Sequence, residues 1–123
     1  MLLRTAAIVA TLAASVVVVG GGTASAARVC KNAPSTADVI TTIDPRSNLR
    51  SSPRLNGAII CTTDRTLKFD IACFERGDFF NDGKTATDVW YRGWVGWGGE
   101  PPGYAWGGNV NTTQDPPNDV RAC

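Results

Sequence analysis

The residues best suited to bind a ligand are aromatic and lie close together near the C-terminal end of the chain. They are Trp90, Tyr91, Trp94, Trp97, Tyr104 and Trp106. Tryptophan at this density can form a flat surface for sugar rings or for an extended peptide. Trp94 and Trp97 stand among glycines and prolines, where burial is difficult, so we expect them at the surface. Trp90 and Tyr104 are better explained by packing inside the fold.

Phe79 and Phe80 are the other aromatic residues that we expect in a ligand surface. They lie in Gly77–Thr87, which is interpreted as a polar loop with Asn81-Asp82-Gly83 at its tip. Two adjacent phenylalanines are unusual in such a loop. We expect this loop and the loop Trp94–Pro102 to form one binding surface.

The chain lacks the residues that most enzymes use for acid–base chemistry. It contains no histidine, which is the usual general base near neutral pH. No spacing of Asp and Glu predicts two carboxylates across a cleft, as glycoside hydrolysis requires. The acidic residues in or beside the long loops are interpreted as solvated charges, with a bound cationic group as the alternative; they are Asp78, Asp82, Asp88 and Glu100. We therefore expect no enzyme, no metal and no cofactor.

The four cysteines, Cys30, Cys61, Cys73 and Cys123, are interpreted as two structural disulfides. They include no Cys-x-x-Cys pair, so a zinc site is not expected. Four cysteines allow three pairings, and their spacing alone does not choose between them. A domain of this size buries only about 60–65% of its unfolded surface, so cross-links contribute much of its stability.

Residues 1–27 have the pattern of an export leader. Arg4 gives it a positive start and Ala6–Val19 form an apolar stretch. Residues 23–27 are small residues suited to peptidase cleavage after Ala26 or Ala27, and we place the cleavage after Ala27. The apolar stretch is too short to span a membrane. The sequence therefore predicts a secreted chain, extracellular or associated with the cell wall, in a compartment where disulfides persist.

Removal of the leader leaves 123 − 27 = 96 residues, which is one small domain. One arginine leaves with the leader, so 12 − 1 = 11 basic residues balance 11 acidic ones. A neutral chain gives no electrostatic reason to bind nucleic acid. After cleavage, no segment is expected in a membrane.

Short stretches of β-branched and aromatic residues, separated by Gly, Pro, Asn and Asp, predict an all-β sandwich or small barrel. The expected strands are Asp38–Ile43, Gly57–Thr62, Thr66–Cys73, Asp88–Val95 and Tyr104–Val110. No stretch of ten residues after the leader shows helical spacing.

The clearest period of two lies in Thr66–Cys73. Leu67, Phe69, Ile71 and Cys73 alternate with Lys68, Asp70 and Ala72. The first set is expected to point inward and the second to lie on a wetter face.

Three segments resemble the bacterial SH3-like domain, a small barrel found in many exported bacterial proteins. The first is Ser47-Asn48-Leu49-Arg50-Ser51-Ser52-Pro53 followed by Gly57-Ala58-Ile59-Ile60. The second is Asp88-Val89-Trp90-Tyr91-Arg92, and the third is Gly103-Tyr104-Ala105-Trp106, ending at Asn109-Val110. The resemblance covers residues 38–110, after an N-terminal arm (28–37) and before a C-terminal tail (111–123).

The resemblance implies a disulfide pairing and a function. It implies that Cys73 pairs with Cys123, which leaves Cys30 with Cys61. Cys61–Cys73 with Cys30–Cys123 is the alternative. SH3-like domains of bacteria often recognise peptides of the cell wall, so the resemblance implies association with peptidoglycan or another extracellular peptide.

The sequence thus favours a secreted, non-catalytic SH3-like barrel that acts as a binding module. The alternative is a secreted inhibitor of an exported protease or other protein, which would use the loop Gly96–Gly103. A small, rigid, disulfide-linked protein with prolines in a loop suits that role. A structural protein without a small ligand is a third possibility.

Overall fold

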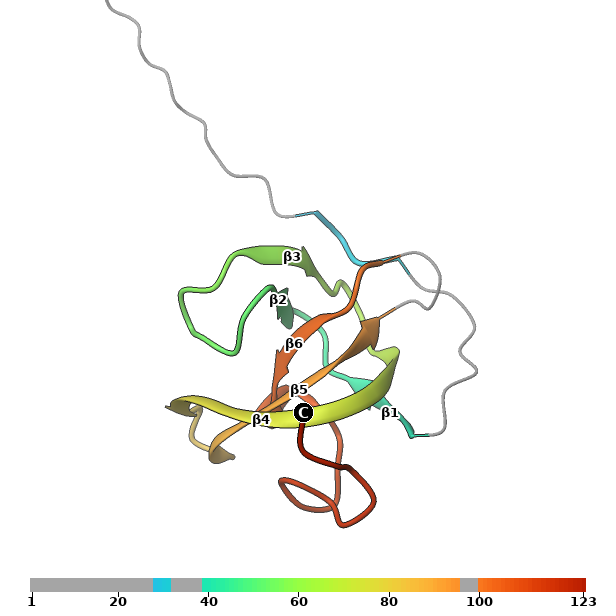
Figure 1. The fold of residues 1–123 in the computed structure, drawn as a ribbon. Coiled ribbons are helices and arrows are strands. Elements are labelled where there is room, and N and C mark those ends of the chain that lie inside the picture. The colour runs from blue at the N-terminus through green and yellow to red at the C-terminus, as the bar shows by residue number, and fades with distance from the viewer. Residues whose placement is uncertain (1–27, 32–38, 96–99) are drawn as a thin grey trace, which may run out of the picture.

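The computed structural model describes residues 28–31, 39–95 and 100–123. The expected leader, most of the expected arm and Trp97 lie outside these ranges. The described chain forms one antiparallel sheet with the strand order β1-β4-β5-β6-β2-β3. The strands are β1 (Ile40–Ile43), β2 (Asn48–Arg50), β3 (Ile59–Thr62), β4 (Leu67–Asn81), β5 (Ala86–Val95) and β6 (Gly103–Trp106). The sheet curls into a half-barrel (Figure 1).

The expected all-β class is confirmed for the described residues. Their only helical element is a 3₁₀ turn, Gly107–Asn109. Within these residues, no helix has the length and the apolar character needed to cross a membrane.

One face of the sheet carries the hydrophobic core. Leu49, Phe69, Tyr91 and Val95 are fully buried members of it. Phe69 lies opposite Val95 where β4 pairs with β5, so the two side chains share a face. Trp90 follows the other alternation and lies outside this cluster, although it is buried.

The alternation expected along Thr66–Cys73 is interrupted at Ala72. Phe69 and Ile71 belong to the core as expected, but Cys73 does not, although it is buried. The register shifts between Ile71 and Cys73, so β4 has one residue more than β5 at this point and Cys73 lies opposite Arg92. Such a bulge moves the following side chain to the other face of the sheet. Asp70, expected on the wetter face, is buried as well.

The expectation of a loop over Gly77–Thr87 is wrong. β4 continues to Asn81 and β5 begins at Ala86, so only residues 82–85 form the turn. Asp82 Oδ1 accepts hydrogen bonds from the backbone N–H groups of Lys84 and Thr85, both at 2.8 Å, and fixes this turn. Polar residues extend so far because this end of the hairpin is largely exposed to water, and an exposed antiparallel pair needs no apolar alternation.

Two shorter segments also differ from expectation. Asn48–Arg50 forms strand β2, although its residues indicated only a motif. The strand expected over Tyr104–Val110 ends at Trp106, and the chain continues as the 3₁₀ turn. Two consecutive glycines at 107 and 108 favour this turn because glycine weakens a strand.

The N-terminal part of the described chain covers the β3 edge of the sheet. The carbonyl oxygen of Arg28 accepts a hydrogen bond from the N–H of Thr62 at 2.7 Å, and the N–H of Cys30 donates to the carbonyl oxygen of Thr62 at 3.0 Å. The disulfide Cys30–Cys61 holds this segment in place.

The C-terminal residues cover the other edge, on β4 beyond the end of β1. The N–H of Phe74 donates to the carbonyl oxygen of Arg121 at 2.9 Å, and its carbonyl oxygen accepts from the N–H of Cys123 at 2.9 Å. Figure 1 shows this end of the chain lying against β4. The disulfide Cys73–Cys123 holds the contact. The two disulfides are therefore paired as the SH3-like resemblance implies.

Replacing Cys73 and Cys123 together by serine is expected to destabilise the fold by about 4 kcal/mol, the chain-entropy value for a loop of this length. Urea unfolding under non-reducing conditions measures this loss. The N–H of Phe74 should also exchange faster with solvent, because the C-terminal segment that accepts its hydrogen bond is no longer held. An unchanged midpoint and unchanged exchange at Phe74 would show that the tail does not depend on its disulfide.

Candidate functional site

The described residues form a pocket of about 370 Å³, which is within the size range of small-ligand sites. Side chains from β2, β5, β6 and the tip of the β4–β5 hairpin contribute to it. Its lining residues are Arg46, Asn48, Arg50, Leu55, Phe80, Asp82, Trp90, Trp106 and Asn109. It is referred to below as the aromatic pocket.

Two indole rings belong to the apolar lining of the aromatic pocket, with Phe80 and Leu55. Trp90 and Trp106 lie opposite each other where β5 pairs with β6, so both side chains are on the face of the sheet away from the core. The indole N–H of Trp90 donates to the carbonyl oxygen of Asp78 at 2.9 Å, and the indole N–H of Trp106 donates to the carbonyl oxygen of Thr87 at 3.0 Å. Both indole donors are thus used within the protein. Both rings are also buried, so they contribute little apolar surface to the pocket, and the exposed Phe80 and Leu55 contribute more.

Phe80 and Gly108 fix the orientation of the Trp106 ring. The ring of Phe80 meets it edge to face, with centroids 5.2 Å apart and planes at 82°. The backbone of Gly108 lies so close that a Cβ atom there would be 1.9 Å from Cζ3 of Trp106. Only glycine allows this contact.

The polar side chains of the aromatic pocket are mainly hydrogen-bond donors. Arg50 donates to the carbonyl oxygen of Gly57 at 2.8 Å, which positions its guanidinium. Asn48 accepts a hydrogen bond from Thr62 at its Oδ1, so its NH₂ group is the part left for a ligand. The one acidic residue, Asp82, already accepts two backbone hydrogen bonds, from Thr85 and Lys84, which lower the pKa of its carboxyl group.

The structure brings together three of the residues predicted from the sequence to bind a ligand: Trp90, Trp106 and Phe80. Phe79, their neighbour in sequence, is exposed and does not line the pocket. Trp97 lies outside the described residues. The expected single surface with the loop Trp94–Pro102 is not seen in the described part of that loop, because none of its residues lines the pocket.

Two predicted tyrosines serve the fold instead. Tyr91 is buried in the core, and its hydroxyl donates to Asp115 Oδ1 at 2.6 Å. Burial and this bond raise the pKa of Tyr91 well above its ordinary value. The hydroxyl of Tyr104 donates to Glu75 at 3.2 Å, and burial raises its pKa too.

Trp94 is half-buried and lies away from the aromatic pocket. It stands opposite Asp70 where β5 pairs with β4. The two carboxylate oxygens of Asp70 are buried and make no hydrogen bond in the described part of the chain.

Five pocket residues were not among those predicted to bind a ligand: Arg46, Asn48, Arg50, Leu55 and Asn109. Asn48 and Arg50 lie in the first SH3-like motif, where they indicated fold rather than function. Arg46 follows a turn proline, and a charged residue at a turn was the signal in the sequence that could have indicated it.

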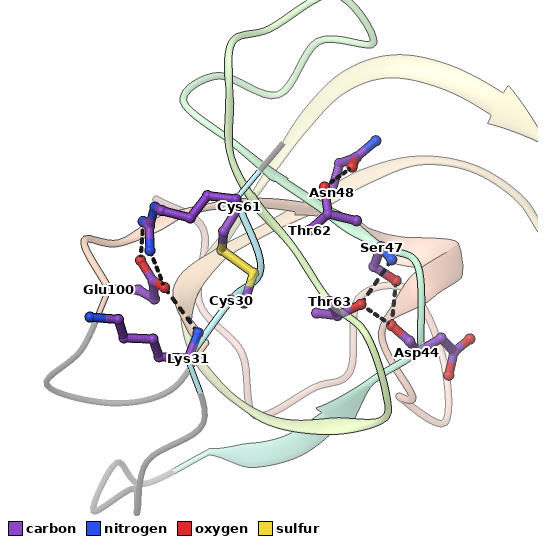
Figure 2. The surroundings of a disulfide bond; sticks show 10 residues. Cys30, Lys31, Asp44, Ser47, Asn48, Cys61, Thr62, Thr63 and Glu100 are labelled. Carbon is purple, nitrogen blue, oxygen red and sulfur yellow. Dashed lines mark hydrogen bonds and ion pairs between the residues drawn. A yellow bond between two sulfur atoms is a disulfide. The ribbon is translucent and has the colours of Figure 1, made fainter. Parts of the chain in front are cut away.

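Glu100 is not a solvated loop charge, and that interpretation is wrong. Its side chain is fully buried. Arg28 donates two hydrogen bonds to its carboxylate, and the N–H of Lys31 donates a third at 3.0 Å. Figure 2 shows this cluster beside the Cys30–Cys61 disulfide. The hydrogen bonds from Arg28 are the main reason why the pKa of Glu100 is lowered. The sequence could not reveal the pair because its partners are 72 residues apart.

Among the described residues, no cluster of three or more His, Cys, Asp or Glu side chains could hold a metal ion. No family model matches the chain, and comparisons with curated proteins and with solved structures also give no match.

Gly108→Ala is expected to displace the Trp106 ring and deform the aromatic pocket. Overpacking of this kind costs about 1–3 kcal/mol. The change should appear as a shift in tryptophan fluorescence and as a lower unfolding midpoint. Gly83→Ala is the control: Gly83 has a positive φ of 92° but no atom near its missing Cβ, so stability falls while the fluorescence stays the same. Unaltered fluorescence in the Gly108 variant would contradict the contact.

Glu100→Gln is expected to destabilise the protein at neutral pH by roughly 1.5–3 kcal/mol, the worth of a hydrogen bond to a charged group. The folded pKa of Glu100 is below its ordinary value of 4.5. Its stabilising effect is therefore complete above the ordinary pKa and disappears as the pH falls through the lower, folded pKa.

Thermal unfolding of both proteins from pH 7 to pH 2 tests this dependence. The difference in unfolding temperature between the wild type and Glu100→Gln should shrink only at acid pH. A difference that stays constant over the whole range would mean that the charge on Glu100 contributes nothing.

Proposed function

We propose that this chain is a secreted, SH3-like binding module without catalytic activity, and that it holds a peptide in the aromatic pocket. Peptides of cell-wall peptidoglycan are the first candidates. The observation that carries the proposal is the pocket itself, in which two internally bonded indoles and Phe80 provide apolar surface beside two arginines.

The fold supports the SH3-like part of the proposal. Five of the six strands contain or adjoin the three motif segments and the alternating strand, and the sheet curls as a small barrel requires. The second and third motifs are neighbours, because Trp90 on β5 lies opposite Trp106 on β6.

Two features support export. Two disulfides suit a protein outside the cytosol, and both are present with no free cysteine among the described residues. Arg28, the residue after the proposed cleavage site, pairs with Thr62 of β3 through its carbonyl oxygen. Cleavage after Ala27 would keep this pairing in the mature chain.

The function is tested with oxidised protein and purified peptidoglycan in a pull-down at low and moderate salt. The wild type is expected to be retained, and Phe80→Ala to be retained at least tenfold less, because the loss of an aromatic contact and its buried area exceeds 1.4 kcal/mol. Phe79→Ala is the matched control. It removes an equally large and more exposed ring that does not line the pocket.

An equal loss of retention on peptidoglycan in both phenylalanine variants would mean that peptidoglycan binds the exposed hairpin and not the aromatic pocket. If the wild type is not retained at either salt concentration, peptidoglycan is excluded as the ligand. If a panel of extracellular peptides then also fails to shift the NMR signals of the pocket residues, the proposal of a binding module is wrong.

A further inference from the structure

Arg46 has a backbone conformation that arginine rarely adopts. Its φ is +60°, the only positive φ at a non-glycine residue in the described chain. Glycine and asparagine are favoured at such positions because other side chains meet steric strain there. Strain of this kind is typical of binding sites, where the surrounding structure maintains it. Arg46 is also exposed and lines the aromatic pocket.

Buried hydroxyl groups hold the turn that carries Arg46. The N–H of Arg46 donates to the carbonyl oxygen of Thr63 at 2.8 Å. The hydroxyls of Ser47 and Thr63 both donate to the carbonyl oxygen of Asp44, each at 2.7 Å. Figure 2 shows the two hydroxyl groups converging on the backbone carbonyl oxygen of Asp44. Ser47 and Thr63 are almost completely buried, so the turn is rigid and sets the direction in which Arg46 leaves the backbone.

The same turn is hydrogen-bonded to another residue that lines the pocket. The N–H of Asp44 donates to the carbonyl oxygen of Asn109 at 2.9 Å, and Asn109 lines the pocket. Arg46 and Asn109 therefore belong to one rigid unit. A ligand that meets Arg46 needs little rearrangement of this wall, which preserves affinity.

The unused groups of the pocket define what a ligand must supply. Within the described residues the guanidinium of Arg46 has no hydrogen-bond or ion-pair partner, in contrast to that of Arg50, which is bonded to Gly57. The NH₂ group of Asn48 is a second free donor; Figure 2 shows its nitrogen turned away from Thr62. Asp82 also lines the pocket, with its Oδ1 bonded to the backbone of its own turn. The other free polar groups are donors beside apolar side chains, and they favour a ligand with an anionic acceptor beside an apolar group.

We propose that the aromatic pocket binds the carboxyl end of a peptide whose last side chain is apolar. Arg46 donates to the terminal carboxylate, and the last side chain packs on Trp106, Phe80 and Leu55. Arginine suits this task because its planar donors match the two oxygens of a carboxylate. This inference rests on the proposed function and specifies its ligand class.

The test uses two probes that differ in one group: acetyl-alanyl-leucine with a free carboxylate, and the same dipeptide as its carboxamide. Binding to the oxidised protein is measured by NMR titration. The signal is the chemical shift of the indole N–H groups of Trp90 and Trp106, which line the pocket. The acid is expected to bind ten- to a hundredfold more tightly than the amide, as a charge-assisted pair of hydrogen bonds provides.

The decisive variant is Arg46→Asn. Asparagine accepts a positive φ, so folding and the melting temperature are expected to be maintained while the preference for the acid is lost. Arg46→Lys should restore part of the preference, because it returns the charge without the planar fork. Arg65→Asn is the matched control, since Arg65 is exposed and does not line the pocket.

The outcomes separate the two proposals. Equal binding of acid and amide, or a preference that persists in Arg46→Asn, overturns the carboxylate assignment and leaves the peptide-binding function standing. No binding of either probe by a protein that still pulls down peptidoglycan also overturns the assignment. If neither the probes nor the wall bind, the proposed function fails with it.

Discussion

The fold depends on the closure of its two sheet edges by the ends of the described chain. An open edge exposes unpaired N–H and C=O groups that invite pairing with other chains. Here Thr62 on β3 and Phe74 on β4 both find backbone partners in terminal segments. Short segments of this kind would separate easily on their own. Each disulfide joins such a segment to the strand that it covers, so the covalent links act where the hydrogen bonds are weakest.

The closed edges also determine where buried charge can exist. Glu100 loses its hydration because the segment at Arg28 lies against it, and the same segment supplies the compensating donors. A buried carboxylate without such donors would oppose folding. The disulfide at Cys30, two residues from Arg28, keeps the donors close to the carboxylate. Edge closure and charge compensation are therefore one structural arrangement, and the sheet face with the aromatic pocket remains open.

The sequence predicts the strands well where one face is buried and poorly where it is not. The alternation Leu67, Phe69, Ile71 reveals β4 because these side chains enter the core. The same strand continues unseen to Asn81, because its residues there are largely exposed and no alternation is required. The bulge before Cys73 was hidden for another reason. One extra residue changes the facing of every later side chain without changing the local pattern.

The pocket was predictable in its aromatic part only. Trp90 and Trp106 stand out by type, whereas Arg46 matters through a backbone angle that no pattern indicates. In the proposed binding mode, the rings and the turn of the pocket are already in position, so association would order few side chains. Under these conditions encounter is similarly fast for related ligands, and selectivity is expressed in how long each one stays. Gly108 would contribute to the lifetime of the proposed complex without touching the ligand, because its close contact keeps the Trp106 ring from turning.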